Sequence, residues 1–291
     1  MAAFSPITLP FRGSIHEQNL RPVPLSPSTT MAAYESKVTF TFDTMCPWTY
    51  LGKKKLDLAL ANYAASTNGH APVDFKVRFA PFQLYPSLGE QAQSKREWYT
   101  TTKYHGSAEQ MAQFEAVMAS YGEPVGIKFS WDGPMANTLH AHRVIQWFQG
   151  VSPDIKPGDD EEDLFDSEDD KKAAQQRYTK YGPPVASKII NALYRMYFEE
   201  ARHPSSAETL VKACVEAGVP EDEAQQAVGG VDQQQPGLAQ VKRKIQMSNS
   251  DGVDSVPTVV FEGRRRDLTL VGAKEAFEYE KAMSTIVKES S

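Results

Sequence analysis

The sequence predicts an α/β fold in which a βαβ unit and a ββα unit enclose a long helical block. Three observations predict it. Two strand patterns flank a helical pattern near the start, several helical patterns fill the middle, and two strand patterns precede a final helix. Apolar residues at every second position are typical of strands, and a spacing of three or four is typical of helices. A strand, a helix and a strand of this length form a βαβ unit, so the first two strands should be parallel.

The βαβ unit begins with residues 38–42 (Val-Thr-Phe-Thr-Phe), which alternate between apolar and polar side chains. Pro47 suits the first turn of the following helix, where a missing N–H costs nothing. Apolar residues then recur at helical spacing as far as Tyr63. Residues 73–79 alternate again and form the second strand.

The middle of the chain is predicted to be helical. Ser205 and Ser206 are candidate N-caps for one of these helices, and Gly218 is a candidate stop. Residues 154–170 differ, because they hold ten acidic residues and one lysine. Such dense like charge indicates a solvated loop, with an acidic interaction segment as the alternative. The helical patterns cover residues 97–104, 108–121, 137–148, 184–200, 206–217 and 222–228.

The end of the chain returns to strands. Residues 257–263 form a strand and a turn, residues 267–271 form a further strand, and Gly272 opens a helix that ends near Val287. Two adjacent strands across a turn that contains glycine form an antiparallel hairpin. The predicted organisation is a disordered tail over 1–35, an α/β domain formed by 36–90 and 250–288, and a helical insertion domain over 91–249 with the acidic loop 154–170.

Composition excludes several classes of protein. The formal net charge of −6 argues against a nucleic-acid binder, and no apolar run is long enough to span a membrane. Two cysteines are too few for a disulfide scaffold or a Cys-rich zinc site, so we expect no metal. The N-terminal segment lacks the apolar core of a secretory signal. We therefore expect a cytoplasmic location, with a mitochondrial one as the weaker alternative.

Cys46 is the candidate nucleophile. It precedes Pro47 at a junction between a strand and a helix. The free N–H groups and the partial positive charge of a helix N-terminus favour a thiolate, so the pKa of Cys46 should lie below its ordinary value. The alternative is a small buried apolar residue.

A second feature is Ser255-Val256-Pro257-Thr258. A proline at the head of a strand either ends pairing or adopts the cis form. In the ββα half it would lie beside the start of the Cys46 helix, and the backbone of Val256 could pair with an extended peptide or glutathione. The alternative is an ordinary trans proline in a turn.

These residues resemble a known family. Residues 43–52 (Asp-Thr-Met-Cys-Pro-Trp-Thr-Tyr-Leu-Gly) are similar to the active-site segment of the DsbA-like thioredoxin family, FrnE subgroup. The resemblance extends from about Ser36 to Lys288 and implies a thioredoxin-like fold with a large helical insertion. Kappa-class glutathione transferases and 2-hydroxychromene-2-carboxylate isomerases share this fold. Five further segments match in order, namely 78–86, 137–143, 193–198, 252–258 and 271–273.

The resemblance also implies roles for individual residues. Cys46 would be the attacking thiol and Pro257 the cis-proline. Apart from the resemblance, we also expect Thr49 in the catalytic group, because its hydroxyl could donate to the Cys46 sulfur. Asn137 and Thr138 would open a helix that faces the active site. The residues implied in binding substrate or glutathione are Pro47, Trp48, Asn137, Thr138, Val256 and Gly272. Trp48 in simple core packing is the alternative, and His142 and Arg143 are interpreted as structural.

One departure from the family matters more than these matches. The FrnE pattern has a second cysteine where this chain has Thr49. A dithiol releases a trapped mixed disulfide through its second sulfur, and Cys46 with Thr49 cannot do so. Cys214 is the other sulfur, but it lies on the apolar stripe of a predicted helix. We expect it to be buried, and a resolving role is the alternative.

Three functions remain open. The first is a thiol oxidoreductase in which Cys46 acts alone, glutathione resolves the mixed disulfide, and the Thr49 hydroxyl donates to the Cys46 sulfur. The second is a glutathione-dependent isomerase or transferase that acts on a small aromatic or polyketide-like substrate. The third is a redox-inactive binding module. The expected partner is a small molecule or a protein disulfide, and a homodimer is a further open prediction. The second function needs a pocket, for which the candidate lining residues are Trp98, Tyr104, Phe114 and Trp131.

Overall fold

The computed structural model describes residues 34–67, 71–154, 161, 164–229 and 235–290. Its central sheet has the order β2-β1-β5-β6. The strands are β1 (Tyr34–Phe42), β2 (Val73–Pro81), β5 (Thr258–Phe261) and β6 (Leu268–Val271). β1 pairs with β2 in parallel, whereas β5 is antiparallel to both β1 and β6. The parallel pair and the hairpin that the sequence predicts are therefore confirmed.

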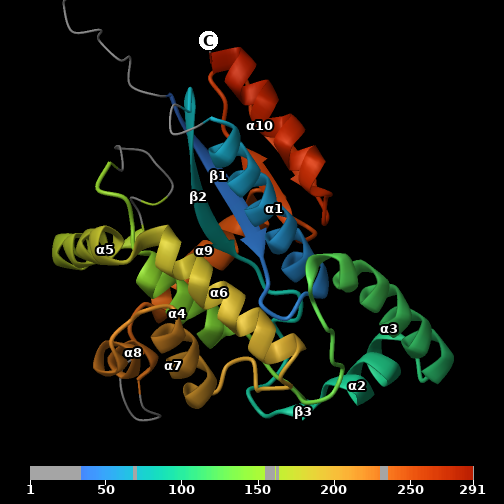
Figure 1. The fold of residues 1–291 in the computed structure, drawn as a ribbon. Helices are drawn as coiled ribbons and strands as arrows, with labels where there is room; N and C mark the ends of the chain where they lie inside the picture. Colours follow the sequence, from blue (N-terminus) through green and yellow to red (C-terminus); the bar gives the residue numbers. More distant parts are fainter. Residues whose placement is uncertain (1–33, 68–70, 155–160, 162–163, 230–234, 291) are drawn as a thin grey trace, which may run out of the picture. The chain divides into compact units, whose positions relative to one another are not determined.

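Helices cover both faces of this sheet. α1 (Pro47–Ser66) and α10 (Ala276–Ser290) pack side by side against one face (Figure 1). The even-numbered residues of β1 point to that face, where the rings of Phe40, Phe42 and Phe79 contact one another at 5.9–6.3 Å. α9 (Leu238–Ser250) lies toward the opposite face, which carries the polar odd-numbered residues of β1. Alternation along the strand thus decides which face forms the main core.

The helical block lies between β2 and β5 in the sequence. Ser206 caps α7 through its hydroxyl, which accepts from the N–H of Thr209, and Gly218 follows the end of that helix with a φ of +95°. Both agree with the predicted start and stop. A two-stranded sheet of β3 (Gln93–Ser94) and β4 (Pro134–Met135) was not expected. The helical elements are α2 (Lys95–Trp98), the π-helical turn η1 (Tyr99–Lys103), α3 (Ala108–Gly122), the 3₁₀ turn η2 (Glu123–Val125), α4 (Leu139–Gln149), α5 (Glu168–Lys180), α6 (Gly182–Phe198), α7 (Ala207–Glu216) and α8 (Glu221–Val228).

The acidic segment is only partly the solvated loop that we expected. Ser167 caps α5, and the acids at 168–170 lie in the first turn, where they interact favourably with the helix dipole. Glu161 lies 3.1 Å from Lys244, and Asp166 lies 2.6 Å from Arg243, so both are tied to α9. The loop prediction was wrong for residues 168–170, because they form the first turn of a helix. It was also wrong for Glu161 and Asp166, because basic residues of α9 pair with them. The remaining acids, between 155 and 163, lie outside the described residues.

The structure tests the predicted tail and the predicted division into domains only in part or not at all. The tail expected over 1–35 lies outside the described residues, except for Tyr34 and Glu35, which begin β1. The proposed division into 36–90, 91–249 and 250–288 stays a prediction. Within the described ranges, no helix has both the length and the apolar character needed to cross a membrane.

Arg143 is a structural residue of the helical block, as interpreted. Its side chain is buried and donates to the carbonyl oxygens of Ala227 and Val228 at 2.5 and 2.6 Å. These are the last carbonyls of α8, which have no partner within their own helix. A third bond, of 3.1 Å, reaches the carbonyl of Pro236 just before α9. One guanidinium therefore holds α4, α8 and the start of α9 together.

Candidate functional site

Cys46 is the N-cap residue of α1. A turn connects it to the end of β1, because its N–H donates to the carbonyl of Asp43 at 3.1 Å. Its own carbonyl accepts from the N–H groups of Thr49 and Tyr50, and Pro47 occupies the first helical position. The sequence therefore placed this cysteine correctly at the junction between strand and helix.

The chain brings Val256 and Pro257 to this helix start. The Cys46 thiol donates to the carbonyl of Val256 at 3.7 Å, and the Val256–Pro257 peptide bond is cis. Cys46 and Val256 form a small apolar cluster with Phe82. The Cys46 side chain is only 4% exposed. Trp48, Leu84 and Val253 pack around this cluster and form its partly exposed rim.

Two glycines fix the position of Pro257. A Cβ atom on Gly52 would lie 2.9 Å from Pro257 Cγ, so only glycine allows α1 to approach the proline this closely. Gly272, with a φ of +85°, donates its N–H to the Pro257 carbonyl at 2.8 Å. Gly272 therefore acts on the site through Pro257. The role of Gly52 was missed, although the residue belongs to the motif that resembles the family.

The pKa of Cys46 is raised, not lowered. Burial is the largest cause and takes it to about 11. The N–H groups of Thr49 and Trp48 at the helix start lower it, and the Asp43 carboxylate raises it further. The expected lowering was wrong for this structure, because loss of water around the sulfur outweighs the N–H groups that the sequence pattern reveals.

Thr49 is fully buried and its hydroxyl is already engaged. Its Oγ1 lies 2.7 Å from the carbonyl oxygens of Asp43 and Cys46, and it accepts from the Tyr194 hydroxyl at 2.8 Å. The single hydroxyl proton is directed to a carbonyl oxygen, and the hydroxyl makes the smallest contribution to the pKa of Cys46. Donation to the sulfur, as we expected, is not the arrangement found.

Cys214 lies in a different environment. It is fully buried in α7, among core residues of the helical block, and both cysteines are free. Burial raises its pKa to about 12. None of the contacts of Cys46 in the described structure involves Cys214. A resolving role for Cys214 therefore has no support in this arrangement.

Asn137 and Thr138 support the site and do not line it. The Asn137 amide donates to the carbonyls of Pro86 and Leu88 and accepts from Gln83, so it fixes the segment that follows β2. Thr138 is buried at the N-cap of α4 without a side-chain cap bond. Both residues lie directly before α4 and so open a helix, as the resemblance implies, but their recorded contacts are with protein.

The four aromatic residues expected to line a pocket form part of the core. Phe114 packs against Trp131 with 4.9 Å between the ring centroids, and against Tyr104 with 5.6 Å between them. Trp98 packs edge-on against Tyr85 at 4.5 Å. The rings contact each other, and thus fill the space that was expected to hold a substrate. Trp48 is partly exposed as well, and it lies on the rim beside Tyr121.

A buried contact between an aspartate and a histidine near Cys46 was also missed. Asp43 and His142 are both fully buried, and His142 Nε2 lies 3.3 Å from Asp43 Oδ1. The other carboxylate oxygen accepts from the N–H of Leu84 at 2.8 Å. Both residues belong to segments that resemble the family, but nothing in the sequence pairs them, since they are 99 positions apart.

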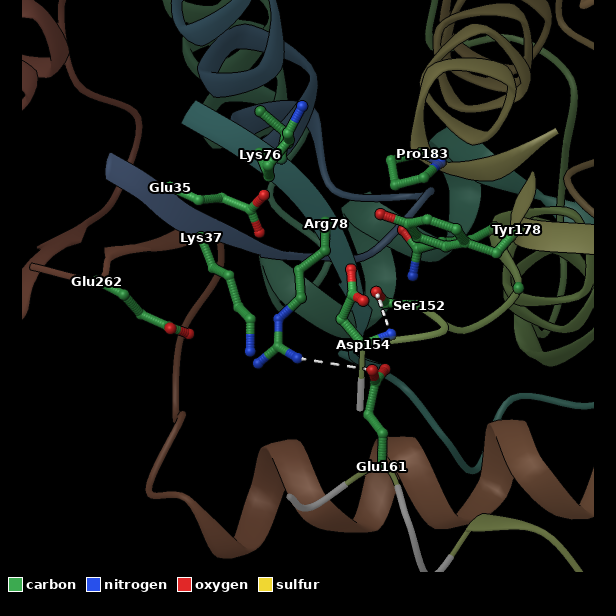
Figure 2. A pocket seen from close by; sticks show the side chains of 13 residues that line it. Glu35, Lys37, Lys76, Arg78, Ser152, Asp154, Glu161, Tyr178, Pro183 and Glu262 are labelled. Atoms are coloured by element: carbon green, nitrogen blue, oxygen red, sulfur yellow. Dashed lines mark hydrogen bonds and ion pairs between the residues drawn. The ribbon is translucent and has the colours of Figure 1, made fainter. Parts of the chain in front are cut away.

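Two cavities lie on the polar face of the sheet. One, of about 250 Å³, is lined by charges of both signs, and Figure 2 shows Lys37 and Arg78 directed toward Glu161 within it. The other, of about 340 Å³, extends along β5 and β6 and includes Val253. Cys46 lines neither of them. Among the described residues, no group of three or more His, Cys, Asp or Glu side chains could hold a metal ion.

Comparison with known proteins finds a family model that matches part of this chain. Residues 37–157, which include Cys46 and the first part of the helical block, match the model of the DSBA-like thioredoxin domain. This chain contains a DSBA-like thioredoxin domain. The match confirms the thioredoxin-like fold and covers three of the segments that resemble the family, namely 43–52, 78–86 and 137–143. A comparison with curated proteins found no match.

Solved structures resemble this chain in fold. One, from Streptomyces coelicolor and provisionally described as a DsbA oxidoreductase, is 22% identical with a TM-score of 0.64, over 87% of this chain and 91% of that one. A second, from Nitrosomonas europaea, is provisionally described as a protein disulfide isomerase. It is 13% identical with a TM-score of 0.55, over 87% of this chain and 98% of that one. A cytosolic disulfide reductase from Pseudomonas aeruginosa with glutathione has a TM-score of only 0.44 at 14% identity, over 87% and 99%.

Proposed function

We propose that this protein is a thiol oxidoreductase in which Cys46 is the single redox-active thiol and glutathione supplies the second one. The observation that carries the proposal is the position of the Cys46 sulfur. It lies at the start of α1, against the Val256 carbonyl and inside a rim of Trp48, Leu84 and Val253. No second sulfur contacts it in the described structure, and Thr49 takes that place in the motif.

The reaction then has two balanced steps. Cys46 attacks one sulfur of a substrate disulfide, a Cys46–substrate disulfide forms, and the other substrate sulfur leaves as a thiolate that takes up a proton. Glutathione next attacks the substrate sulfur of this mixed disulfide. Cys46 leaves as a thiolate and is reprotonated, while the substrate departs as its disulfide with glutathione. The net result is exchange of one thiol in the substrate disulfide for glutathione.

The groups around Cys46 suit an extended ligand. Phe82 and the start of α1 cover the sulfur, and the partly buried side chains of the rim lie around it, so a ligand would have to displace rim side chains to reach the thiol. A ligand that pairs with the backbone of Val256 takes over the carbonyl to which the thiol now donates. Because Pro257 has no N–H, it leaves the neighbouring edge free of a competing donor. Pro47 and Trp48 complete the approach.

A second candidate is a glutathione-dependent isomerase or transferase. The observation that favours it is the raised pKa of Cys46, which leaves a neutral thiol at physiological pH. A neutral S–H group can donate a hydrogen bond to a glutathione thiolate, which would then be the nucleophile toward a small electrophile. The packing of Phe114 against Tyr104 and Trp131 counts against it, because these rings contact one another instead of lining an open pocket.

Turnover with glutathione separates these candidates. The assay follows formation of glutathione-containing disulfide from a small peptide disulfide and reduced glutathione. We expect turnover for the wild type and for C214A, and none for C46A. Glutathione binding without disulfide exchange in any variant would favour the second candidate. If the protein neither binds glutathione nor exchanges disulfides, the redox-inactive binding module is the function that remains. A cytoplasmic location, where thiols stay reduced, remains the prediction that goes with this function.

A further inference from the structure

The outer edge of β2 is capped by side chains at both of its ends. β2 is an edge strand of the central sheet, with β1 on its other side. The N–H and C=O of Val73 contact the Tyr63 hydroxyl at 3.4 and 3.0 Å. The N–H of Phe79 donates to the side chain of Gln149 at 2.8 Å, and its C=O accepts from Gln149 and Gln146. The backbone groups of these two residues therefore point away from β1 and are satisfied there.

The middle of the same edge has no such caps. Phe75 and Val77 lie at alternate positions between Val73 and Phe79, so their N–H and C=O groups also point outward. Within the part of the chain that the structure describes, no hydrogen bond reaches these outward groups. Unpaired backbone groups on an edge strand are a template for pairing with another strand. We call this stretch, formed by the outward groups of Phe75 and Val77, the open edge.

A cavity lies on each face of the sheet beside the open edge. One is the cavity of about 250 Å³ on the polar face, and the other, of about 520 Å³, lies on the face that α1 covers. Both are lined by Lys76 and Val77 of β2 and by Tyr178 and Pro183, which come from α5 and α6. Figure 2 shows Tyr178 and Pro183 on the side of the first cavity opposite Lys37. The two cavities therefore meet at the open edge.

A strand added at this edge would use both cavities, because its successive side chains point to opposite faces of the sheet. Phe75 faces the α1 side, where its ring centroid lies 5.0 Å from that of Tyr63. Directly opposite residues of an antiparallel pair share a face. The ligand residues opposite Phe75 and Val77 would therefore enter the larger cavity, beside the apolar side chain of Leu60. The ligand residue between them would enter the smaller cavity, opposite Lys76.

The charges of β2 favour an acidic residue at this central position. Lys76 and Arg78 are the side chains of β2 that carry charge in the smaller cavity. Lys76 pairs with Asp74 at 2.6 Å, but both side chains are about half exposed, so the pair is weak and leaves the lysine accessible. The acids of the cavity lie on β1, after β5 or after α4, and not on the edge strand. Opposite charges directly across two strands attract each other.

We propose that the open edge of β2 binds an extended peptide segment as an added antiparallel strand with the pattern apolar, acidic, apolar. Phe75 and Val77 each offer one N–H and one C=O to its backbone, which gives affinity, and the alternate side chains in the two cavities give specificity. The acidic side chain pairs with Lys76. Cys46 lines neither cavity, so this site is separate from the thiol and does not depend on the proposed function.

The first test observes backbone pairing. The peptide acetyl-Thr-Val-Glu-Val-Thr-amide is titrated to millimolar concentration into the isotope-labelled full chain, and amide signals are followed by NMR. We expect saturable shifts and slower hydrogen exchange at Phe75 and Val77. N-methyl groups on both valines remove the N–H groups that face β2 and should weaken binding about tenfold, whereas N-methylation of the glutamate, whose N–H points away, should change it little. No saturable shift at these residues, or equal binding of the valine-methylated peptide, would overturn the proposal.

The second test uses variants of the edge strand. In K76E the glutamate peptide should bind about threefold more weakly, and a peptide with lysine in its place about threefold more tightly. K242E, which changes an exposed lysine of α9, is the matched control and should alter neither affinity.

V77P removes an outward N–H that takes no part in the ladder, so an edge strand should tolerate it, and binding of both peptides should be lost. K76E changes an exposed side chain and still decides if V77P does not fold. Unchanged affinities for both peptides in K76E, or wild-type binding by folded V77P, would contradict the proposal. None of these readouts needs turnover at Cys46.

Discussion

The two cysteines show what burial and position each contribute to a thiol. Both are buried, and burial raises the pKa of Cys46 to about 11 and that of Cys214 to about 12. Cys46 lies at the N-terminus of α1, where two N–H groups lower its pKa and so oppose the effect of burial. The residues of the rim pack around it. Cys214 lies inside a helix, and only the charge of Arg143 opposes burial there. The two thiols are therefore similar in burial and differ in the groups that oppose it, which are helix N–H groups for Cys46 and a guanidinium for Cys214.

The largest effect is expected when Cys46 is given the second thiol that it lacks. In T49C a second sulfur takes the place of the Thr49 hydroxyl, one helical turn from Cys46. Under mild oxidation we expect an internal disulfide and exchange that no longer depends on glutathione. Counting free thiols by alkylation and intact mass measures this. T49S, which adds no sulfur, should stay dependent on glutathione, and a T49C protein with both thiols free after oxidation would refute the role given to position 49.

A change near Cys214 should affect stability without affecting Cys46. R143M leaves the carbonyls of Ala227, Val228 and Pro236 without their buried donor. We expect a loss of about 3 kcal/mol in the free energy of unfolding, measured by urea titration. Cys214 should become open to alkylation while the half-point of Cys46, the pH at which its alkylation rate is half-maximal, stays the same. An equal gain in reactivity at both cysteines would show that the two regions are not independent.

The approach of α1 to Pro257 can be disturbed by one methyl group. In G52A the new Cβ would press on Pro257 Cγ. Overpacking costs about 2 kcal/mol and the better helix propensity of alanine returns up to about 1, so the net loss should be about 1 kcal/mol. Exchange at Cys46 should slow as Val256 shifts. G89A adds the same methyl group where the nearest atom is 3.9 Å away, and it should change neither property. Wild-type exchange in G52A would show that the position of Pro257 is not needed.

The smallest effect should come from Tyr194. Y194F removes one buried hydroxyl that donates to Thr49, at a cost of about 0.5–1 kcal/mol in thermal or urea unfolding. Because the Thr49 hydroxyl contributes least to the pKa of Cys46, the alkylation half-point should barely move. A clear shift would mean that Thr49 influences the sulfur more strongly than its bonds to carbonyl oxygens indicate.

The sequence predicts the fold where its pattern is local. The strand before Asp43, the helix after Cys46 and the final hairpin all carry their signals in neighbouring residues, and each is found. α9 was missed, because its many polar and charged residues conceal a narrow apolar face on which Val241 is buried. α5 was missed because its acids suggest a loop, although at a helix start they are stabilising.

The site could be predicted only in part for the same reason. Cys46 and Pro257 belong to motifs that are visible in the sequence. The high pKa of Cys46 depends on Phe82 and Val256, which reach the sulfur from distant segments, and on Asp43, whose partner His142 comes from another helix. Helix position can be inferred from spacing, but burial is decided by which segments meet.

The most direct measurement is intact mass after single-turnover reaction with oxidised glutathione, in C214A and C46A. If Cys46 is the single redox thiol, C214A should gain one glutathione, which excess reduced glutathione should remove again. Folded C46A should gain none. Peptide mapping should place it on the segment that contains Cys46. Glutathione attached to C46A at an equal rate, or none on C214A even after prolonged reaction at alkaline pH, would contradict the proposed function.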